Sequence, residues 1–244
     1  MKINQLLANG HKKIAILIDP DKNNSKVQLV PLIDKINSLN PAFIFVGGST
    51  VDRLDFKNCI SILKAYTRIP VIIFPGSHLQ IDERADAILF LSLISGRNPD
   101  FLIGHQVEAA PILKNLDLEV IPTAYMLIDG GINSSVAYVS QTSPIPCDQN
   151  SIAVNTAIAG ELMGKKAIFM DAGSGAIQSI SPKMIADVKE NINIPLIIGG
   201  GLKTIEEVET VLNAGADVAV IGNKIEENID FLLDLMSIQN NVQQ

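Results

Sequence analysis

Short apolar runs alternate with longer segments of mixed polarity along most of the chain. An unbroken run of about four to six apolar residues is typical of a parallel strand buried on both faces, because helices cover both sides of such a sheet. The strands predicted in this way are Ile14–Ile18, Phe43–Val46, Val71–Phe74, Ala87–Leu91, Glu119–Pro122, Ala167–Met170, Ile194–Ile198 and Ala216–Ile221.

Most segments between these runs show the polar–apolar period of a surface helix. The predicted helices are Lys26–Leu39, Val51–Tyr66, Phe101–Leu116 with a break or kink at Pro111, Ser151–Met163, Pro182–Asn191, one that opens at Lys203-Thr204, and a last one that begins at Gly222. Two segments depart from the pattern. The gap between Phe74 and Ala87 is too short for a full helix, and Asn133–Asn150 has no clear helical period.

Strands that alternate with helices predict an α/β protein, and this number of strands favours closure into a barrel. We expect a single (β/α)8 TIM barrel over residues 1–244, with an irregular third crossover in place of a full helix. An open doubly wound sheet would carry its glycine fingerprint at the first strand–helix turn. That turn reads Asp19-Pro20-Asp21-Lys22 instead.

Composition narrows the class of protein further. The chain is 47% hydrophobic without tryptophan, and its formal net charge is −7 with no basic run, which argues against nucleic-acid binding. No apolar run reaches the roughly 18 residues of a membrane span, and the first residues do not resemble a signal peptide. Cys59 and Cys147 suggest neither a zinc site nor a disulfide. We therefore expect a cytoplasmic protein.

Glycines follow the last two predicted strands. Gly199-Gly200-Gly201 ends one strand and Gly222-Asn223 ends the next. Backbone amides at such turns bind anions, and a (β/α)8 barrel builds its phosphate site at this place. The alternative is that the glycines only form tight turns.

Four polar side chains at or near strand ends are candidates for chemistry. Asp19 with the Ser49 hydroxyl would give the partial ligand shell that Mg²⁺ prefers, although Asp19 would also suit a turn before Pro20. Asp171 precedes the loop Ala172–Gly175 and is either a general base for a substrate hydroxyl or an Asx turn. Tyr125 either lines the pocket or packs in the core.

The remaining candidates are weaker. His78 falls near the expected barrel mouth, whereas His11 lies in a polar lead-in and His105 on a predicted helix. Their spacing supports no metal site, so structural roles are expected for all three. Arg97 lies in a polar loop and would either reach an anion or remain at the surface.

Nine stretches, in order along nearly the whole chain, carry a family resemblance. They are Ile18–Lys22, Val46–Ser49, Phe74–Ser77, Ser92–Pro99, Ala124–Gly131, Pro144–Pro146, Met170–Gly175, Gly199–Gly201 and Gly222-Asn223. Together they resemble the geranylgeranylglyceryl phosphate synthase family, and they are most similar to its group II.

The resemblance implies a prenyltransferase of phospholipid biosynthesis. Such an enzyme joins sn-glycerol 1-phosphate to an all-trans prenyl diphosphate, most often geranylgeranyl diphosphate, through an ether bond, and releases pyrophosphate. It implies Mg²⁺ held by Asp19 and Ser49, Asp171 as the catalytic residue, and a homo-oligomer, either a dimer or a hexamer. The implied glycerol phosphate site comprises Phe169, Met170, Asp171, Ala172, Gly173, Ser174, Gly175, Gly200, Gly201, Gly222 and Asn223.

Three positions depart from the family pattern. Much of the family has Glu at position 171 and often Tyr at position 169, where this chain has Asp171 and Phe169. Some bacterial relatives have Lys at the position of Leu17. These departures bear on the choice of substrate.

A prenyl tail needs an apolar groove, and the irregular third and fourth crossovers would form one lined by Leu91, Leu93 or Ile94. Two other functions are open from the residues alone. One is a phosphate-binding barrel that acts on sugar phosphates without Mg²⁺, as an isomerase or lyase. The other is a non-catalytic phosphate-binding scaffold, which would need only the glycines.

Overall fold

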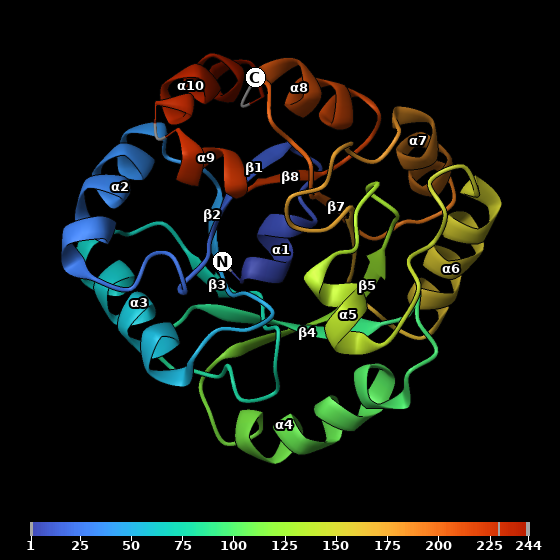
Figure 1. Cartoon of the computed structure of the whole chain (residues 1–244), viewed down its shortest axis with the longest axis horizontal. Helices are drawn as coiled ribbons and strands as arrows, with labels where there is room; N and C mark the ends of the chain where they lie inside the picture. Colours follow the sequence, from blue (N-terminus) through green and yellow to red (C-terminus); the bar gives the residue numbers. More distant parts are fainter. Residues whose placement is uncertain (1, 229, 243–244) are drawn as a thin grey trace.

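The strands pair in chain order until the last returns to the first. The computed structural model describes residues 2–228 and 230–242, and within them eight parallel strands close a barrel (Figure 1). The strands are β1 (Lys13–Ile18), β2 (Phe43–Val46), β3 (Val71–Ile73), β4 (Ala87–Leu93), β5 (Glu119–Leu127), β6 (Ala167–Asp171), β7 (Leu196–Gly199) and β8 (Val218–Ile221). The predicted TIM barrel is confirmed.

The helices are α1 (Ile3–Leu7), α2 (Lys26–Leu39), α3 (Arg53–Tyr66), α4 (His105–Leu113), α5 (Ser135–Ser140), α6 (Asn150–Leu162), α7 (Pro182–Glu190), α8 (Ile205–Asn213), α9 (Asn223–Glu227) and α10 (Phe231–Val242). Most of them surround the barrel on its outside, whereas α1 lies within the ring that they form (Figure 1). A π-helical turn, Asp100–Gly104, leads into α4. Local sequence sets several of the helix starts: Ser181 caps α7 ahead of Pro182, and Thr204 forms a capping box with Glu207 on α8.

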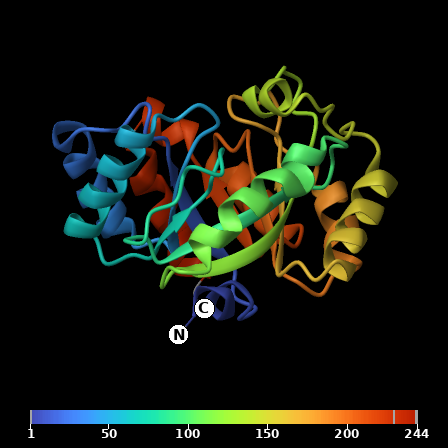
Figure 2. The same cartoon turned by 90° about the horizontal axis from the view of Figure 1, so that it is seen from below.

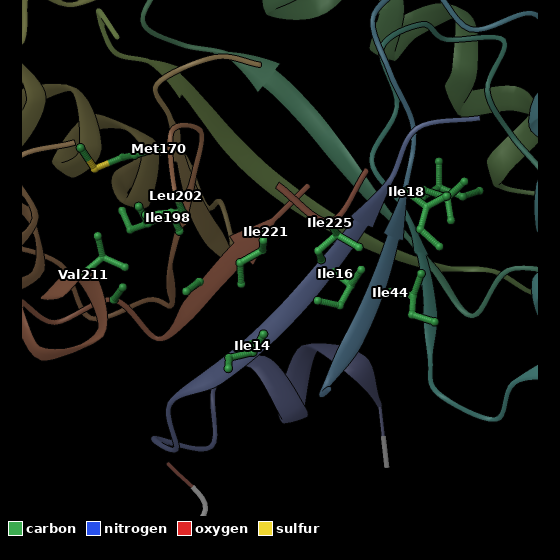
Figure 3. Packing of buried hydrophobic residues seen from close by; sticks show 14 of the residues in the cluster. Ile14, Ile16, Ile18, Ile44, Met170, Ile198, Leu202, Val211, Ile221 and Ile225 are labelled. Atoms are coloured by element: carbon green, nitrogen blue, oxygen red, sulfur yellow. The ribbon is translucent and has the colours of Figure 1, made fainter. Parts of the chain in front are cut away.

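Alternation along the strands divides the core into two layers. Side chains such as Phe43, Phe45 and Phe169 fill the inside of the barrel. At the alternate strand positions, Ile14, Ile16 and other aliphatic side chains point outward and pack under the helices (Figure 3). Because the period of a strand is two, each strand contributes to both layers. The barrel is therefore a packed core and not a pore.

Helix α1 lies across one end of the barrel, a feature that the sequence analysis missed. Ile3 and Leu7 join the inner core, and the Glu119 carboxylate accepts hydrogen bonds from the amides of Ile3 (2.7 Å) and Asn4 (2.9 Å). Figure 2 shows α1 projecting below the sheet. This helix covers the N-terminal end of the barrel, so the functional site belongs at the opposite end.

Several predicted boundaries were wrong around β4 and β5. Strand β5 continues through residues 123–127, beyond its predicted end at Pro122, because β4 and β6 both pair with it there. Strand β4 includes Leu93 for the same reason. The segment 133–150 contains helix α5, whose start is capped by Ser134. Pro111 does not break α4, since it lies two residues before the helix end and removes only one hydrogen bond.

The irregular third crossover is confirmed. Residues 74–86, all of them described, contain no helix. This segment folds as turns that lie against the outside of the barrel. The next helix along this part of the chain is α4, which follows β4 (Figure 1). These turns therefore take the place of a full helix between β3 and β4.

The two faces of α3 give a direct test of the packing. Phe56 is fully buried and Leu54, two residues earlier, is 72% exposed. Phe56→Ala should reduce the free energy of unfolding by about 3–5 kcal/mol through lost burial and a cavity. Leu54→Ala should change it by no more than about 0.5 kcal/mol. Chemical denaturation monitored by circular dichroism measures both, and equal effects would contradict the assigned helix face.

Candidate active site

The carboxyl ends of the strands surround one polar cavity, which we call the cup. Residues from the loops after β1, β2, β6, β7 and β8 line it, together with the first residues of α5. Among the predicted site residues, those that line the cup are Asp19, Ser49, Phe169, Asp171, Gly173, Ser174, Gly175, Gly200, Gly201, Gly222 and Asn223. Residues that are far apart in sequence are thus brought together as predicted.

Gly200 allows the loop after β7 to pack directly on the loop after β6. Its φ is +81°, and a Cβ at this position would lie 2.6 Å from Asp171 Oδ1 and 2.7 Å from the amide nitrogens of Ala172 and Gly173. Only glycine fits such a position. Within the described chain, the amides of Ser174, Gly175, Gly200 and Gly201 donate no backbone hydrogen bond. Amides without an internal partner are suited to hold an anion.

Asp171 is the buried carboxylate of the cup, and both of its oxygens have donors. The Tyr125 hydroxyl donates to Oδ2 at 2.7 Å, and the Gly173 amide donates to Oδ1 at 2.7 Å. Burial raises the pKa of Asp171, and these two hydrogen bonds oppose that rise. Burial and the adjacent carboxylate raise the pKa of Tyr125 well above its usual value, so this hydroxyl keeps its proton. Tyr125 therefore orients the carboxylate.

The side chains of residues 169–175 do not all face the cup. Phe169 points into the barrel, where its ring stacks on Phe74 with centroids 4.7 Å apart, and it lines the cup. Met170 and Ala172 point outward into the helix-facing core. Their side chains therefore do not line the cup, and the Ala172 amide is already bonded to the Gly199 carbonyl. The period of two along β6 explains the difference.

Asp19 and Ser49 lie on the other side of the cup. Asp19 is half-buried, which raises the pKa of its carboxyl, and its Oδ1 accepts the Asp21 amide at 3.1 Å, as a turn-forming aspartate would. Gly48 approaches so closely that a Cβ there would lie 3.0 Å from that same oxygen.

These residues fit Mg²⁺ better than a metal held by protein alone. No group of three or more His, Cys, Asp or Glu side chains within the described residues is placed to hold a metal. One carboxylate and one hydroxyl form the kind of incomplete shell that Mg²⁺ completes with water and substrate phosphates.

An apolar groove opens beside the cup, between the third crossover and α4. Gly48, Ser49 and Phe74 line both the groove and the cup. Leu91 and Leu93 line the groove as predicted, whereas Ile94 is buried in the helix-facing core.

Two histidines also line this groove. The rings of His78 and His105 lie 5.1 Å apart, and His78 pairs with Glu108 at 3.1 Å. Arg97 donates to the carbonyls of Ile94 and Gly96, which ties it to its own loop. Arg97 is exposed, which agrees with the surface alternative, and His78 lies near the mouth as predicted.

Sequence reasoning missed several residues of the site. Lys203 and Lys224 line the cup and add positive charge to it. Gln80, in the third crossover, makes hydrogen bonds to the loops after β2 and β3. The lysines closely follow the two glycine motifs, which is a signal that could have identified them. Gln80 follows no such motif, so only the fold reveals its position.

The fold and the site define a (β/α)8 barrel whose cup is suited to an anion and adjoins an apolar groove. A family model described as the PcrB family matches residues 9–239, and the chain belongs to this family.

Relatives and solved structures agree with this assignment. The chain is 48% identical over 223 residues to the geranylgeranylglyceryl phosphate synthase of Flavobacterium johnsoniae, with 91% of each chain covered. It is 44% identical over 230 residues to that of Spirosoma linguale, with 94% of this chain and 92% of the relative covered.

A crystal structure of (S)-3-O-geranylgeranylglyceryl phosphate synthase from Thermoplasma acidophilum, in complex with its substrate sn-glycerol-1-phosphate, superposes with a TM-score of 0.92. The identity is 32%, and 99% of this chain and 98% of that chain are covered.

The packing around Gly200 yields a prediction about anion binding. Gly200→Ala should weaken binding of inorganic phosphate by about tenfold or more, because the methyl group would force the two loops apart. Gly164→Ala is the matched control, since Gly164 has a similar φ of +84° but no atom within 4 Å of the added Cβ. It should cost about 1–2 kcal/mol of stability and leave phosphate binding intact. Calorimetric titration distinguishes these results, and equal affinities for both variants would contradict the packing argument.

Proposed function

We propose that the protein is a prenyltransferase that joins sn-glycerol 1-phosphate to an all-trans prenyl diphosphate, geranylgeranyl diphosphate by preference, through an ether bond. The observation that carries the proposal is the junction of the cup with the apolar groove at Gly48, Ser49 and Phe74. A site that takes a phosphate on one side and a long apolar chain on the other suits these two substrates. The names of the relatives support the same reaction and a place in phospholipid biosynthesis.

Glycerol phosphate binds by its phosphate. The amides of Ser174, Gly175, Gly200 and Gly201 donate to the phosphate oxygens, and Gly222 and Asn223 close the opposite side. Fixing the phosphate brings the glycerol hydroxyl toward Asp171 and removes most of its freedom of orientation. The aromatic floor of Phe169 and Phe74 excludes water beneath it.

Asp171 accepts the proton of the attacking hydroxyl. A carboxylate whose pKa is raised by burial is a stronger base than one in water, and the Tyr125 hydroxyl holds it in place. The glycerol oxygen forms its bond to C1 of the prenyl group while the bond from C1 to the diphosphate oxygen breaks. Pyrophosphate leaves with the bonding electrons.

Asp19 and Ser49 would hold Mg²⁺ at the mouth of the groove. Bound there, the ion neutralises charge on the diphosphate leaving group. The diphosphate would then lie where the cup meets the groove at Ser49, and its prenyl chain would extend into the groove.

The protein acts as a homo-oligomer, a dimer or hexamer, in the cytoplasm. The exposed face of α4 and the turn before it supports self-association, because Ile103, Val107 and Ile112 are each about half or more exposed. Within the described residues, no helix is long and apolar enough to cross a bilayer.

A product assay tests the reaction directly. Purified protein is given sn-glycerol 1-phosphate and a mixture of prenyl diphosphates, with and without Mg²⁺, and products are identified by mass spectrometry. The expected product is a prenylglyceryl phosphate ether that forms only with Mg²⁺, with the geranylgeranyl chain preferred. Folded protein that yields no ether with any chain length would overturn the proposal in favour of a sugar-phosphate enzyme.

Replacing Asp171 should affect the free energy of unfolding and the rate of catalysis in different ways. Because burial raises its pKa in the folded protein, the folded state binds the proton more tightly than the unfolded chain, whose carboxyl titrates near about 3.9. The free energy of unfolding therefore falls as pH rises from that value through the folded pKa.

Asp171→Asn removes this loss, so the variant should be at least as stable as wild type at neutral pH. Its kcat should fall by about 100-fold or more. Urea unfolding at several pH values and steady-state kinetics measure the two effects. A variant that keeps wild-type kcat would exclude Asp171 as the base.

A further inference from the structure

The loops after β2 and β3 meet backbone to backbone beside the metal-binding side chains. A Cβ at Gly76 would lie 2.3 Å from the Gly48 carbonyl oxygen and 2.7 Å from Ser49 Cα. No side chain fits between the two loops at this contact. A side chain can therefore connect them only from the flank of the contact.

Gln80 supplies that connection from the third crossover. Its Nε2 donates to the Gly48 carbonyl at 3.0 Å, and its Oε1 accepts the Gly76 amide at 2.9 Å. The side chain is 3% exposed, so both bonds are made out of contact with water. Loss of a buried partner leaves a backbone donor and acceptor unsatisfied, which displaces the groups that made the bonds.

The backbone that Gln80 holds, at Gly48 and Ser49, borders both the cup and the groove. Gly48 and Ser49 line the cup and the apolar groove, and Gly48 lies against Asp19. A shift of this backbone moves the Ser49 hydroxyl relative to the Asp19 carboxylate. The glycerol phosphate side of the cup, around Gly200 and Asp171, makes no bond to Gln80 among the described residues.

From this arrangement we infer that Gln80 is a positioning residue, which sets the Gly48–Ser49 backbone for the diphosphate end of the prenyl substrate. The inference rests on the proposed function. It assigns to Gln80 an effect on diphosphate and Mg²⁺ that does not extend to glycerol phosphate. A purely structural glutamine would affect both substrates alike.

Three variants test the inference. Gln80→Leu removes both hydrogen bonds at similar volume. Gln80→Glu keeps the acceptor for the Gly76 amide, but it can donate to the Gly48 carbonyl only when protonated. Glu119→Leu is the control, because it also removes two side-chain bonds to backbone amides, at the opposite end of the barrel. Thermal unfolding checks that each variant is folded.

Calorimetry with inorganic pyrophosphate plus Mg²⁺, and separately with sn-glycerol 1-phosphate, is the primary measurement. Gln80→Leu should weaken pyrophosphate binding by about tenfold or more and change glycerol phosphate affinity by less than about twofold. The KM for prenyl diphosphate should rise in parallel. Gln80→Glu should approach wild-type pyrophosphate affinity as pH falls from about 8 to about 5.5, since burial favours its protonated, donating form. Glu119→Leu should change neither affinity.

Other outcomes overturn the inference in distinct ways. Equal weakening of both ligands in Gln80→Leu would reduce Gln80 to a structural role, as would a Gln80→Glu affinity that does not vary with pH relative to wild type. If Gln80→Leu does not fold, the pH series of Gln80→Glu decides the question alone. Wild-type protein that makes no ether would overturn the proposed function. The pyrophosphate affinities of wild type and Gln80→Leu would still test whether Gln80 positions the Gly48–Ser49 backbone.

Discussion

The contact between Gly200 and the start of the loop after β6 determines the form of the whole cup. At this point the backbone of one loop lies on the carboxylate and amides of the next, with no room for a side chain between them. The contact orients the amides of both loops toward one space and buries Asp171 behind them. The amides that suit a phosphate and the raised pKa of Asp171 thus arise from the same packing.

The missing third helix has the complementary effect on the other side. Because residues 74–86 form turns, an apolar groove lies along β4 between this segment and α4. The third crossover also carries Gln80, which fixes the loops after β2 and β3 against each other. One irregular segment therefore provides room for a long apolar chain and supports the place where its charged end would lie.

Much of this arrangement could be predicted from the sequence. Apolar runs of strand length gave the barrel, and the rule that strand ends share one face brought Asp19, Ser49, Asp171 and the glycines together. The extension of β5 could not be seen, because its last residues are strand only through pairing with β4 and β6. The bond from Tyr125 to Asp171 depends on that extension and was missed with it. Gln80 was missed because its partners are backbone groups, which leave no pattern in the sequence.

A crystal structure with sn-glycerol 1-phosphate bound tests the central claim most directly. The account predicts the phosphate on the amides of residues 174–175 and 200–201, with a glycerol hydroxyl within hydrogen-bonding distance of Asp171. A phosphate bound instead beside Asp19 and Ser49, or a glycerol that points away from Asp171, would contradict the assignment of glycerol phosphate to the Gly200 side of the cup.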